Sequence, residues 1–438
     1  MKEPSHRVSV ALFITTLLLI IGLNADAQTK QKANTKTLTL GVVFQGPSKP
    51  LEEHFRPLVD YAARTLTSTA ETQGMVVVAP TAGQMMKLLE EKRVDFYMTR
   101  ARKRSKVLVL FDTAGTPPAN QDFTKELKTD DWAAEAHVIE ALKQLGHEVR
   151  TIGVWDEPGM IIDEIKANPP DVVFNLTEHF NEVSAYDRNV AGLLEMLGVP
   201  YTGSSPTGLT LCKNKGMAKE LLAYHKIRVP NFAIFSPGAT IKRPSRLKFP
   251  LFIKPAEEEA SYGISLDSFV ENDEAFEERV RFIHEKMNQT ALVEEYIEGR
   301  EIYVSLLGND SLRVFPFREV IFSEIPEGQP RFSTFKAKWD DAYRKRWGIQ
   351  NVFAEPFANG TEQRIVKICK AVYRALRIRG YGRIDLRVTP EGEIVILEAN
   401  PNPNLDRDDE FAQSAVKAAL SYPRMIQRIL KLAFDAAR

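Results

Sequence analysis

The 438-residue sequence has little cysteine, no excess charge of either sign and only one long apolar run. Its two cysteines, Cys212 and Cys369, lie far apart, so neither a disulfide framework nor a cysteine-based zinc site is expected. Lys and Arg together number 58, as do Asp and Glu, so no general attraction to nucleic acid or anionic lipid is expected. The chemistry must come from other side chains, spread over roughly two to four domains for a chain of this length.

The long apolar run lies at the start of the sequence, where residues 8–23 follow Lys2 and Arg7 and precede Ala25, Asp26 and Ala27. A basic head, a short apolar middle and small residues after it are typical of a secretory signal peptide. We expect residues 1–27 to be a signal peptide cleaved after Ala27, or an uncleaved anchor, although the run is shorter than the ~20 residues of most membrane spans. Either would place the protein outside the cytoplasm or at a membrane.

Residues 28–99 alternate between strand-like and helix-like patterns, with strands expected at 38–44, 75–78 and 95–98. This order resembles the first part of a phosphonate-type periplasmic solute-binding protein. Such proteins enclose their ligand between two full lobes, and this segment supplies half of one, so we expect a structural remnant or docking element. The basic residues that follow, within 100–106, are expected to form a solvated linker and not a nucleic-acid patch.

Residues 107–208 show the alternation of a doubly wound parallel sheet. Strands are expected at 107–111, 149–154 and 171–174, and helices at 134–145, 160–165 and around 193–197. The remainder, 209–438, is richer in hairpins, with strands expected at 251–254, 292–297, 302–307, 314–322, 383–388 and 394–398 and a helix at 362–376. The fold class is therefore α/β followed by α+β, the order expected for a nucleotide clamp built from two sheets.

The last predicted hairpin carries the strongest chemical signal. Because alternate residues of a strand share a face, Arg383 and Asp385 point one way on the first strand, as Glu398 and Asn400 do on the second. Two carboxylates and an amide oxygen form a set suited to Mg²⁺. The alternative is a solvated strand face with a cross-strand ion pair. Convergence of several polar groups beside the turn at 401–404 favours the metal site.

Two lysines and one acidic segment complete the candidate site. Lys254 ends an apolar strand, where its ammonium should reach into a cleft, and Lys215 opens a helix. Taken alone, each is more often a surface residue. In residues 292–301, backbone groups could read a purine edge while an acid takes ribose hydroxyls. The alternative for this segment is a plain edge strand with a solvated acidic face.

Six short segments in order and at suitable spacing resemble the D-alanine–D-alanine ligase branch of the ATP-grasp enzymes. They are DVVFNL (171–176), PYTGS (200–204), CKNK (212–215), FIKP (252–255), GYGRID (380–385) and LEAN (397–400). The resemblance extends over residues 107–432. It implies a pre-ATP-grasp domain at 107–208 and a two-part ATP-grasp domain at 209–438.

The same resemblance implies a role for each candidate residue. Lys215 and Lys254 would contact the ATP phosphates, and Arg383 would stabilise the oxyanion of the tetrahedral intermediate. Lys338 matches a lysine on a mobile loop over the phosphates, and Ser261 belongs to a loop that covers them with backbone amides. Glu294, Tyr296 and Ile297 would frame the adenine, Glu301 would bind the ribose, and Asp385, Glu398 and Asn400 would hold Mg²⁺, with Mn²⁺ as the alternative ion.

The implied function is ATP-dependent ligation of a carboxylate to an amine through an acyl phosphate. It implies amino acids or related small molecules as substrates and a homodimer as the assembly, with no nucleic-acid partner. The alternative is an exported or membrane-anchored binding or scaffold protein whose ATP-grasp module no longer acts. The signal-like leader favours that alternative, because ATP chemistry requires the cytoplasm.

The sequence departs from the family pattern on the substrate side. Residues 112–115 (DTAG) replace the segment that supplies an acid for the first amino acid, and Trp339 stands where a tyrosine is usual. Residues 401–405 (PNPNL) replace the family's Gly-Met-Thr and are followed by Asp406, Asp408 and Asp409. Such an acidic patch should disfavour the free carboxylate of a second amino acid.

Overall fold

The computed structural model describes residues 37–43, 73–79, 96–98, 104–118, 121–258, 261–326 and 328–436. The chain divides into two compact units, Met1–Lys103 and Arg104–Arg438. Their boundary falls within the basic residues 100–106, although Lys106 is already the first residue of a strand.

The first unit contains a three-stranded parallel sheet in the order β2-β1-β3. Its strands lie at the three places where the sequence predicts them. The expected helices between them, and the signal-like residues 1–27, lie outside the described residues. The strands are β1 (Thr37–Val43), β2 (Gln73–Ala79) and β3 (Phe96–Met98).

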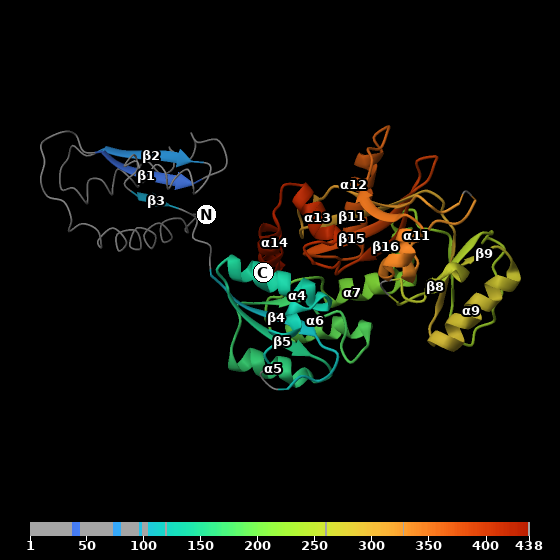
Figure 1. The fold of residues 1–438 in the computed structure, drawn as a ribbon, viewed down its shortest axis with the longest axis horizontal. Coiled ribbons are helices and arrows are strands. Elements are labelled where there is room, and N and C mark those ends of the chain that lie inside the picture. Colours follow the sequence, from blue (N-terminus) through green and yellow to red (C-terminus); the bar gives the residue numbers. More distant parts are fainter. Residues whose placement is uncertain are drawn as a thin grey trace, which may run out of the picture. The chain divides into compact units, whose positions relative to one another are not determined.

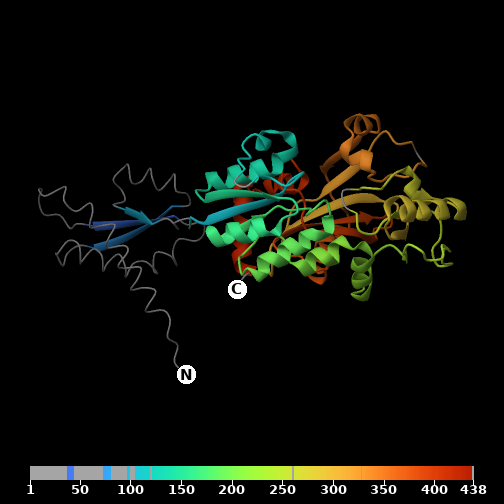
Figure 2. The same cartoon turned by 90° about the horizontal axis from the view of Figure 1, so that it is seen from below.

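The second unit begins with a parallel sheet in the order β5-β4-β6, as the alternating pattern predicts. Its strands are β4 (Lys106–Asp112), β5 (Glu148–Val154) and β6 (Val172–Asn175). Successive β4 residues point to opposite faces, and residues 107–111 are all apolar and buried, so both faces must be covered. Figure 2 shows helices on both sides of this sheet. They are α4 (Ala133–Gln144), α5 (Pro158–Ala167) and α6 (Asp187–Met196).

The C-terminal helix α14 (Tyr422–Ala436) packs on the same face of this sheet as α4. Its Met425 and Ile429 are fully buried in one core with Phe111 of β4 and Leu142 of α4. In Figure 1, α14 (red) lies next to α4, although the two are far apart in sequence. The end of the chain therefore completes the core of the first sheet of this unit.

A smaller antiparallel sheet follows, in the order β7-β10-β8-β9. Helix α9 (Asp273–Met287) covers one face, where its Phe276 and Val280 pack against Ile253 and Val293. The strands are β7 (Phe232–Phe235), β8 (Leu251–Pro255), β9 (Phe269–Val270) and β10 (Ala291–Glu295), and helices α7 (Pro206–Lys213) and α8 (Lys215–Tyr224) precede them.

The third sheet of this unit is antiparallel and runs β14-β13-β11-β15-β16, with β12 paired to β11. One face is apolar and packs against α12 (Thr361–Ala375), so the other face is left for polar side chains. The sequence predicts one strand at 314–322, but the structure has two, because Pro316 lies between them and has no N–H for a sheet. The strands are β11 (Arg300–Leu307), β12 (Arg313–Val314), β13 (Arg318–Phe322), β14 (Ile349–Phe353), β15 (Tyr381–Val388) and β16 (Ile394–Asn400).

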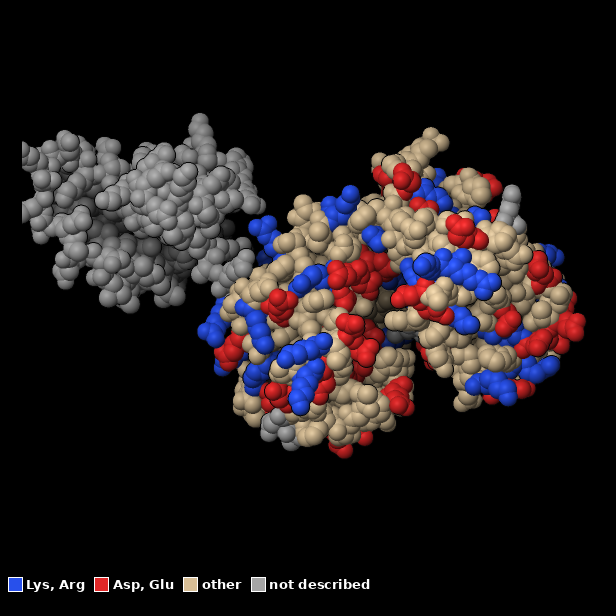
Figure 3. Space-filling view, in the orientation of Figure 1, with Lys and Arg blue, Asp and Glu red and all other residues tan. Residues whose placement is uncertain are grey.

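Shorter helices connect these sheets. They are α10 (Phe335–Trp339), α11 (Asp341–Arg346) and α13 (Glu410–Lys417), with 3-10 turns at Glu126–Lys128, Asp130–Trp132, Ser184–Tyr186 and Leu266–Ser268. In the described part of the chain, every helix is too short or too polar to cross a bilayer. Over the described residues on the face in view, Figure 3 shows acidic and basic side chains interspersed, in keeping with their equal numbers.

Candidate active site between the two antiparallel sheets

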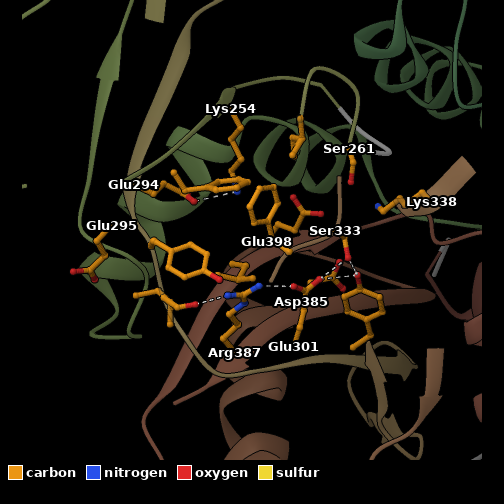
Figure 4. Close-up of a pocket in the computed structure, with 17 residues that line it drawn as sticks. Lys254, Ser261, Glu294, Glu295, Glu301, Ser333, Lys338, Asp385, Arg387 and Glu398 are labelled. Atoms are coloured by element: carbon orange, nitrogen blue, oxygen red, sulfur yellow. Dashed lines mark hydrogen bonds and ion pairs between the residues drawn. The ribbon is translucent and has the colours of Figure 1, made fainter. Parts of the chain in front are cut away.

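Two adjoining cavities contain all the site residues that the sequence predicts. The first lies between the β7–β10 sheet and the polar face of the β11–β16 sheet (Figure 4). The second shares Tyr303, Ser333, Lys338 and Glu398 with the first. Of the predicted residues, the first cavity is lined by Lys254, Ser261, Glu294, Tyr296, Ile297, Glu301, Lys338, Asp385 and Glu398, and the second by Lys215, Lys338, Arg383, Glu398 and Asn400.

The strand register explains why polar side chains gather on one face. Glu301 of β11 lies opposite Arg387 of β15, and Tyr303 lies opposite Asp385. Facing residues in an antiparallel pair share a face, so these side chains all point toward the cavities. The residues between them, such as Ile302 and Leu386, point to the apolar core with α12.

A β-bulge in β16 brings Glu398 to this face. Asp385 is paired with Glu398, but the next residue, Leu386, is paired with Ile396, which leaves Leu397 as an extra residue. Without it, strict alternation from the buried Ile396 would turn Glu398 into the apolar core. Bulges commonly reorient side chains beside active sites. The predicted facing of Asp385 and Glu398 is confirmed, but the bulge behind it was not predicted.

Glu398 lies among cations that keep it ionised. Burial opposes ionisation, but Lys215, Lys254, Lys338 and Arg383 lower its pKa to about 2. Within the described residues, no hydrogen bond or ion pair engages its carboxylate. An ionised and unengaged carboxylate at the boundary of two cavities can bind a cation or repel a misplaced anion.

Asp385 is held by the arginine two residues before it. Arg383 donates to both oxygens of Asp385, at 2.7 and 2.9 Å, and to Glu410 Oε2 at 3.1 Å. Its guanidinium also lies 4.6 Å from the centroid of the Tyr303 ring. Burial raises the pKa of Asp385, and the two carboxylates keep the pKa of Arg383 above its ordinary value. The arginine is therefore charged and fixed in direction.

The predicted ligands suit a hard divalent cation by their chemistry. Asp385 and Glu398 are carboxylates and Asn400 supplies an amide oxygen, on two neighbouring strands. Asp385 lines the first cavity and Asn400 the second, while Glu398 lines both. The Asn400 oxygen also accepts from the backbone N–H of Asn402 at 2.9 Å, which fixes its position. Within the described residues, no three His, Cys, Asp or Glu side chains form a metal-binding group, so this set depends on the asparagine.

Glu294 is buried between two lysines. Its two oxygens lie 2.8 Å from Lys219 Nζ and 3.1 Å from Lys254 Nζ (Figure 4 labels Lys254 and Glu294). Burial would raise the pKa of Glu294, but the lysines hold it below the ordinary value. The carboxylate is thus turned toward the lysines, and residues 294–297 line the cavity. The implied contact with adenine stays a prediction.

Lys219 is a site residue that the sequence analysis did not identify. Besides Glu294, it contacts the carbonyl oxygen of Leu397, the bulge residue, at 2.8 Å. Burial lowers its pKa to about 8, and Glu294 opposes that effect. Lys219 follows Lys215 by four residues in α8, so both lie on one helix face. That spacing was the available signal.

Glu301 is fixed by three neighbours that were also not predicted. Its Oε1 accepts from Tyr303 Oη and Ser333 Oγ, both at 3.0 Å, and its Oε2 accepts from Arg387 Nη2 at 2.8 Å. Figure 4 shows Ser333 and Arg387 pointing into the same space as Glu301. Ser333 lies outside the strands, so no sequence pattern placed it here.

The comparisons with known proteins agree with this geometry. Residues 221–431 match the family model described as D-ala D-ala ligase C-terminus. A D-alanine–D-alanine ligase of Desulforudis audaxviator is 30% identical over 251 residues, covering 56% of this chain and 77% of that protein. An uncharacterized protein of Sinorhizobium fredii, y4sG, is 34% identical over 303 residues, covering 68% of this chain and 86% of that protein.

The fold is also that of solved ligases. The D-alanine–D-alanine ligase of Bacillus anthracis, complexed with ATP, superimposes with a TM-score of 0.58 at 20% identity, covering 76% of this chain and 98% of that one. The expected likeness of residues 38–98 to a periplasmic binding protein gains no support from these matches.

The two facing sheets with the polar site between them have the ATP-grasp fold. The family model and the curated relatives make the protein a ligase that forms carbon–nitrogen bonds with ATP. The shared identity and coverage are sufficient to place the chain in a family: it belongs to the D-alanine–D-alanine ligase family. The predicted resemblance and the predicted α/β plus α+β fold are confirmed.

Proposed function

We propose that ATP binds in the first cavity and that a carboxylate and an amine meet in the second. The observation that carries this proposal is the shared boundary, where Lys338 and Glu398 line both cavities. A γ-phosphoryl group at that boundary would lie within reach of a carboxylate on the other side. The carboxylate oxygen attacks the γ-phosphorus, the bond to the ADP oxygen breaks, and an acyl phosphate forms.

Lysines are the groups proposed to hold the phosphates. Lys254 projects from β8 and Lys338 from α10, so two separate elements bring positive charge to the first cavity. Positive charge fixed in this way offsets the charge that spreads over the transferring oxygens. Glu294 and Lys219 keep Lys254 in position behind the cavity.

Asp385, Glu398 and Asn400 are the residues proposed to hold Mg²⁺. When bound there, Mg²⁺ would supply positive charge beside the phosphate oxygens. The chain itself keeps Glu398 ionised through its ring of cations, which makes the carboxylate ready for a metal.

Arg383 is proposed to stabilise the oxyanion in the second step. The amine attacks the acyl carbon, the carbon–oxygen bond to phosphate breaks, and phosphate leaves with the bonding electrons while the amine loses its proton. Arg383 lines the second cavity and is held by Asp385 and Glu410, so its direction needs no adjustment. This scheme requires no covalent bond between the substrate and a side chain of the enzyme.

Amino acids or closely related molecules are the proposed substrates, since the curated relatives are named for D-alanine. The non-catalytic alternative is not favoured, because the family match extends over the lysine-bearing and acid-bearing parts of the site. The homodimer stays a prediction.

The test is Mg²⁺-dependent ADP release by the full chain with a panel of D- and L-amino acids, each with and without hydroxylamine. Hydroxylamine traps an acyl phosphate as a hydroxamate, so it reports the first step without any knowledge of the natural amine. We expect hydroxamate from at least one amino acid. Absence of both hydroxamate and ADP with every member would contradict the proposal.

A further inference from the structure

Two side chains from one short segment line the second cavity and have no part in the scheme above. They are Trp339, the last residue of α10, and Arg344, in the helix α11 that follows directly. Arg344 Nη1 donates to the carbonyl oxygen of Ala337 at 2.5 Å, so the guanidinium is held against the helix that carries Trp339. A large apolar ring and a cation therefore reach the cavity from one connected segment.

Arg344 differs from the other cations of this cavity in what it contacts. Those cations are Lys213, Lys215, Lys338 and Arg383. Arg383 is held by two carboxylates, Lys213 lies 2.8 Å from the buried Asp187, and Lys215 and Lys338 are the lysines expected at the phosphates. In the described part of the chain, no carboxylate forms an ion pair with Arg344, whose side chain is half-buried. Its planar fork of N–H groups is suited to a substrate carboxylate.

The acids that follow the PNPNL segment are less of an obstacle to a carboxylate than the sequence suggests. Asp408 is exposed, while Asp409 and Glu410 line the second cavity. The Oε2 of Glu410 accepts from Arg383 at 3.1 Å, so its charge is already compensated. The repulsion expected from this segment therefore comes mainly from Asp409, and Arg344 can offset it.

Trp339 belongs to a row of exposed aromatic rings. Its side chain is 64% exposed although it lines the second cavity. Its ring centroid lies 6.4 Å from that of Phe335, one turn earlier in α10, and Phe335 lies 6.1 Å from Tyr262. Phe335 and Tyr262 are exposed as well. Contiguous apolar surface beside a site marks a place where a ligand buries apolar surface of its own. Because the row reaches the cavity at Trp339, that ligand is a molecule already held in the cavity.

We infer that the amine substrate is an amino acid with a large apolar or aromatic side chain, which packs on Trp339 while its carboxylate pairs with Arg344. This inference rests on the proposed function, since it concerns the second substrate of the same reaction. The carboxylate of the donor reacts with ATP, so the one left to pair with Arg344 is that of the amine. A small side chain would leave the indole in water, and an amide would leave the guanidinium without a counterion.

The test compares amines that differ in one part of the molecule. With a carboxylate donor identified by hydroxamate formation, the full chain is given phenylalanine, alanine or phenylalaninamide, each as the D and the L form. The amide product is quantified by mass spectrometry. In the preferred stereochemistry, we expect kcat/KM for phenylalanine to exceed the values for alanine and for phenylalaninamide by about tenfold or more.

Two variants assign the two preferences to their residues. Trp339→Ala should remove most of the preference for phenylalanine over alanine and keep the preference over phenylalaninamide, and Arg344→Gln should do the reverse. Trp339→Phe should retain much of the first preference, because it keeps an aromatic face. Arg346→Gln is the matched control, because it removes the same charge from an exposed position of the same short helix, and it should keep both preferences.

Hydroxamate formation separates these variants from misfolded ones, because it reports the first step without the amine. We expect it to be unchanged in Trp339→Ala and in Arg344→Gln. Equal or better use of alanine or phenylalaninamide by the unchanged chain, unaltered preferences in the variants, or loss of hydroxamate in either variant would overturn the inference alone. Absence of hydroxamate with every donor in the unchanged chain would contradict the proposed function, and this inference with it.

Discussion

Asp385 and Glu398 lie directly opposite each other on β15 and β16. Residues two apart on a regular strand share a face, so Glu398 would be expected to point into the apolar core with the buried Ile396. The bulge at Leu397 turns Glu398 to the opposite face. Lys219 binds the bulge residue's carbonyl. The acid pair therefore depends on a local irregularity that a helix holds in place.

Glu398→Gln should abolish most of the Mg²⁺-dependent ADP release. The change keeps the size of the side chain but removes the charge that faces the lysines and the proposed metal, so we expect a loss on the order of 100-fold or more in kcat. Steady-state kinetics over a range of Mg²⁺ concentrations measures it. Glu391→Gln, in the exposed turn of the same hairpin, should be without effect. Near-normal activity of Glu398→Gln would rule out the assigned role.

Lys219→Met should lower the free energy of unfolding by about 2–4 kcal/mol, because it leaves the buried Glu294 with one counterion in place of two. Urea denaturation followed by circular dichroism provides the measurement. Adding Glu294→Gln should recover part of the loss, since the uncompensated charge is then removed. The single variant should also raise the KM for ATP, because Lys219 helps to hold Glu294, and Glu294 in turn positions Lys254. A double variant less stable than the single one would contradict the buried-charge explanation.

Asp409→Asn should stabilise the free protein at pH 8 more than at pH 4. Below the ordinary pKa of 3.8, Asp409 is protonated in both the folded and the unfolded chain and contributes nothing. As pH rises to about 6, the unfolded chain ionises first, so folding loses stability, and above that the deficit is constant at about 1–3 kcal/mol. Denaturant unfolding at the two pH values tests this. An equal effect at both would show that the charge is not the cause.

Lys338→Ala should reduce kcat by about tenfold to a hundredfold while leaving the fold unchanged. The described residues hold no hydrogen-bond or ion-pair partner for this side chain, and it borders both cavities. Lys336→Ala, exposed on the same short helix, is the control. Rapid quenching would show whether the first step is slowed. A variant that unfolds, or one with full activity, would contradict the assignment.

The segments that carry the candidate site residues could be predicted because charged side chains are rare in apolar strands. Lys254 after an apolar strand and Asp385 within another are visible in one sequence, and the structure brings both to one cavity. Most strands of the three main sheets of the second unit were predicted within a few residues, since alternation and apolar runs are local. The short strands β7, β9 and β14 were not predicted, and neither was the break at Pro316.

By itself, the sequence determined the order of the sheets, the alternation that puts acids and arginines on one face, and the family resemblance. The tertiary structure alone decided which polar groups meet. It buried Lys219 beside Glu294, put Ser333 on Glu301, packed α14 against α4, and turned Asp409 toward the cavity while Asp408 faces solvent. The physical reason is that such contacts join residues distant in sequence, and their energies depend on burial that no local pattern records.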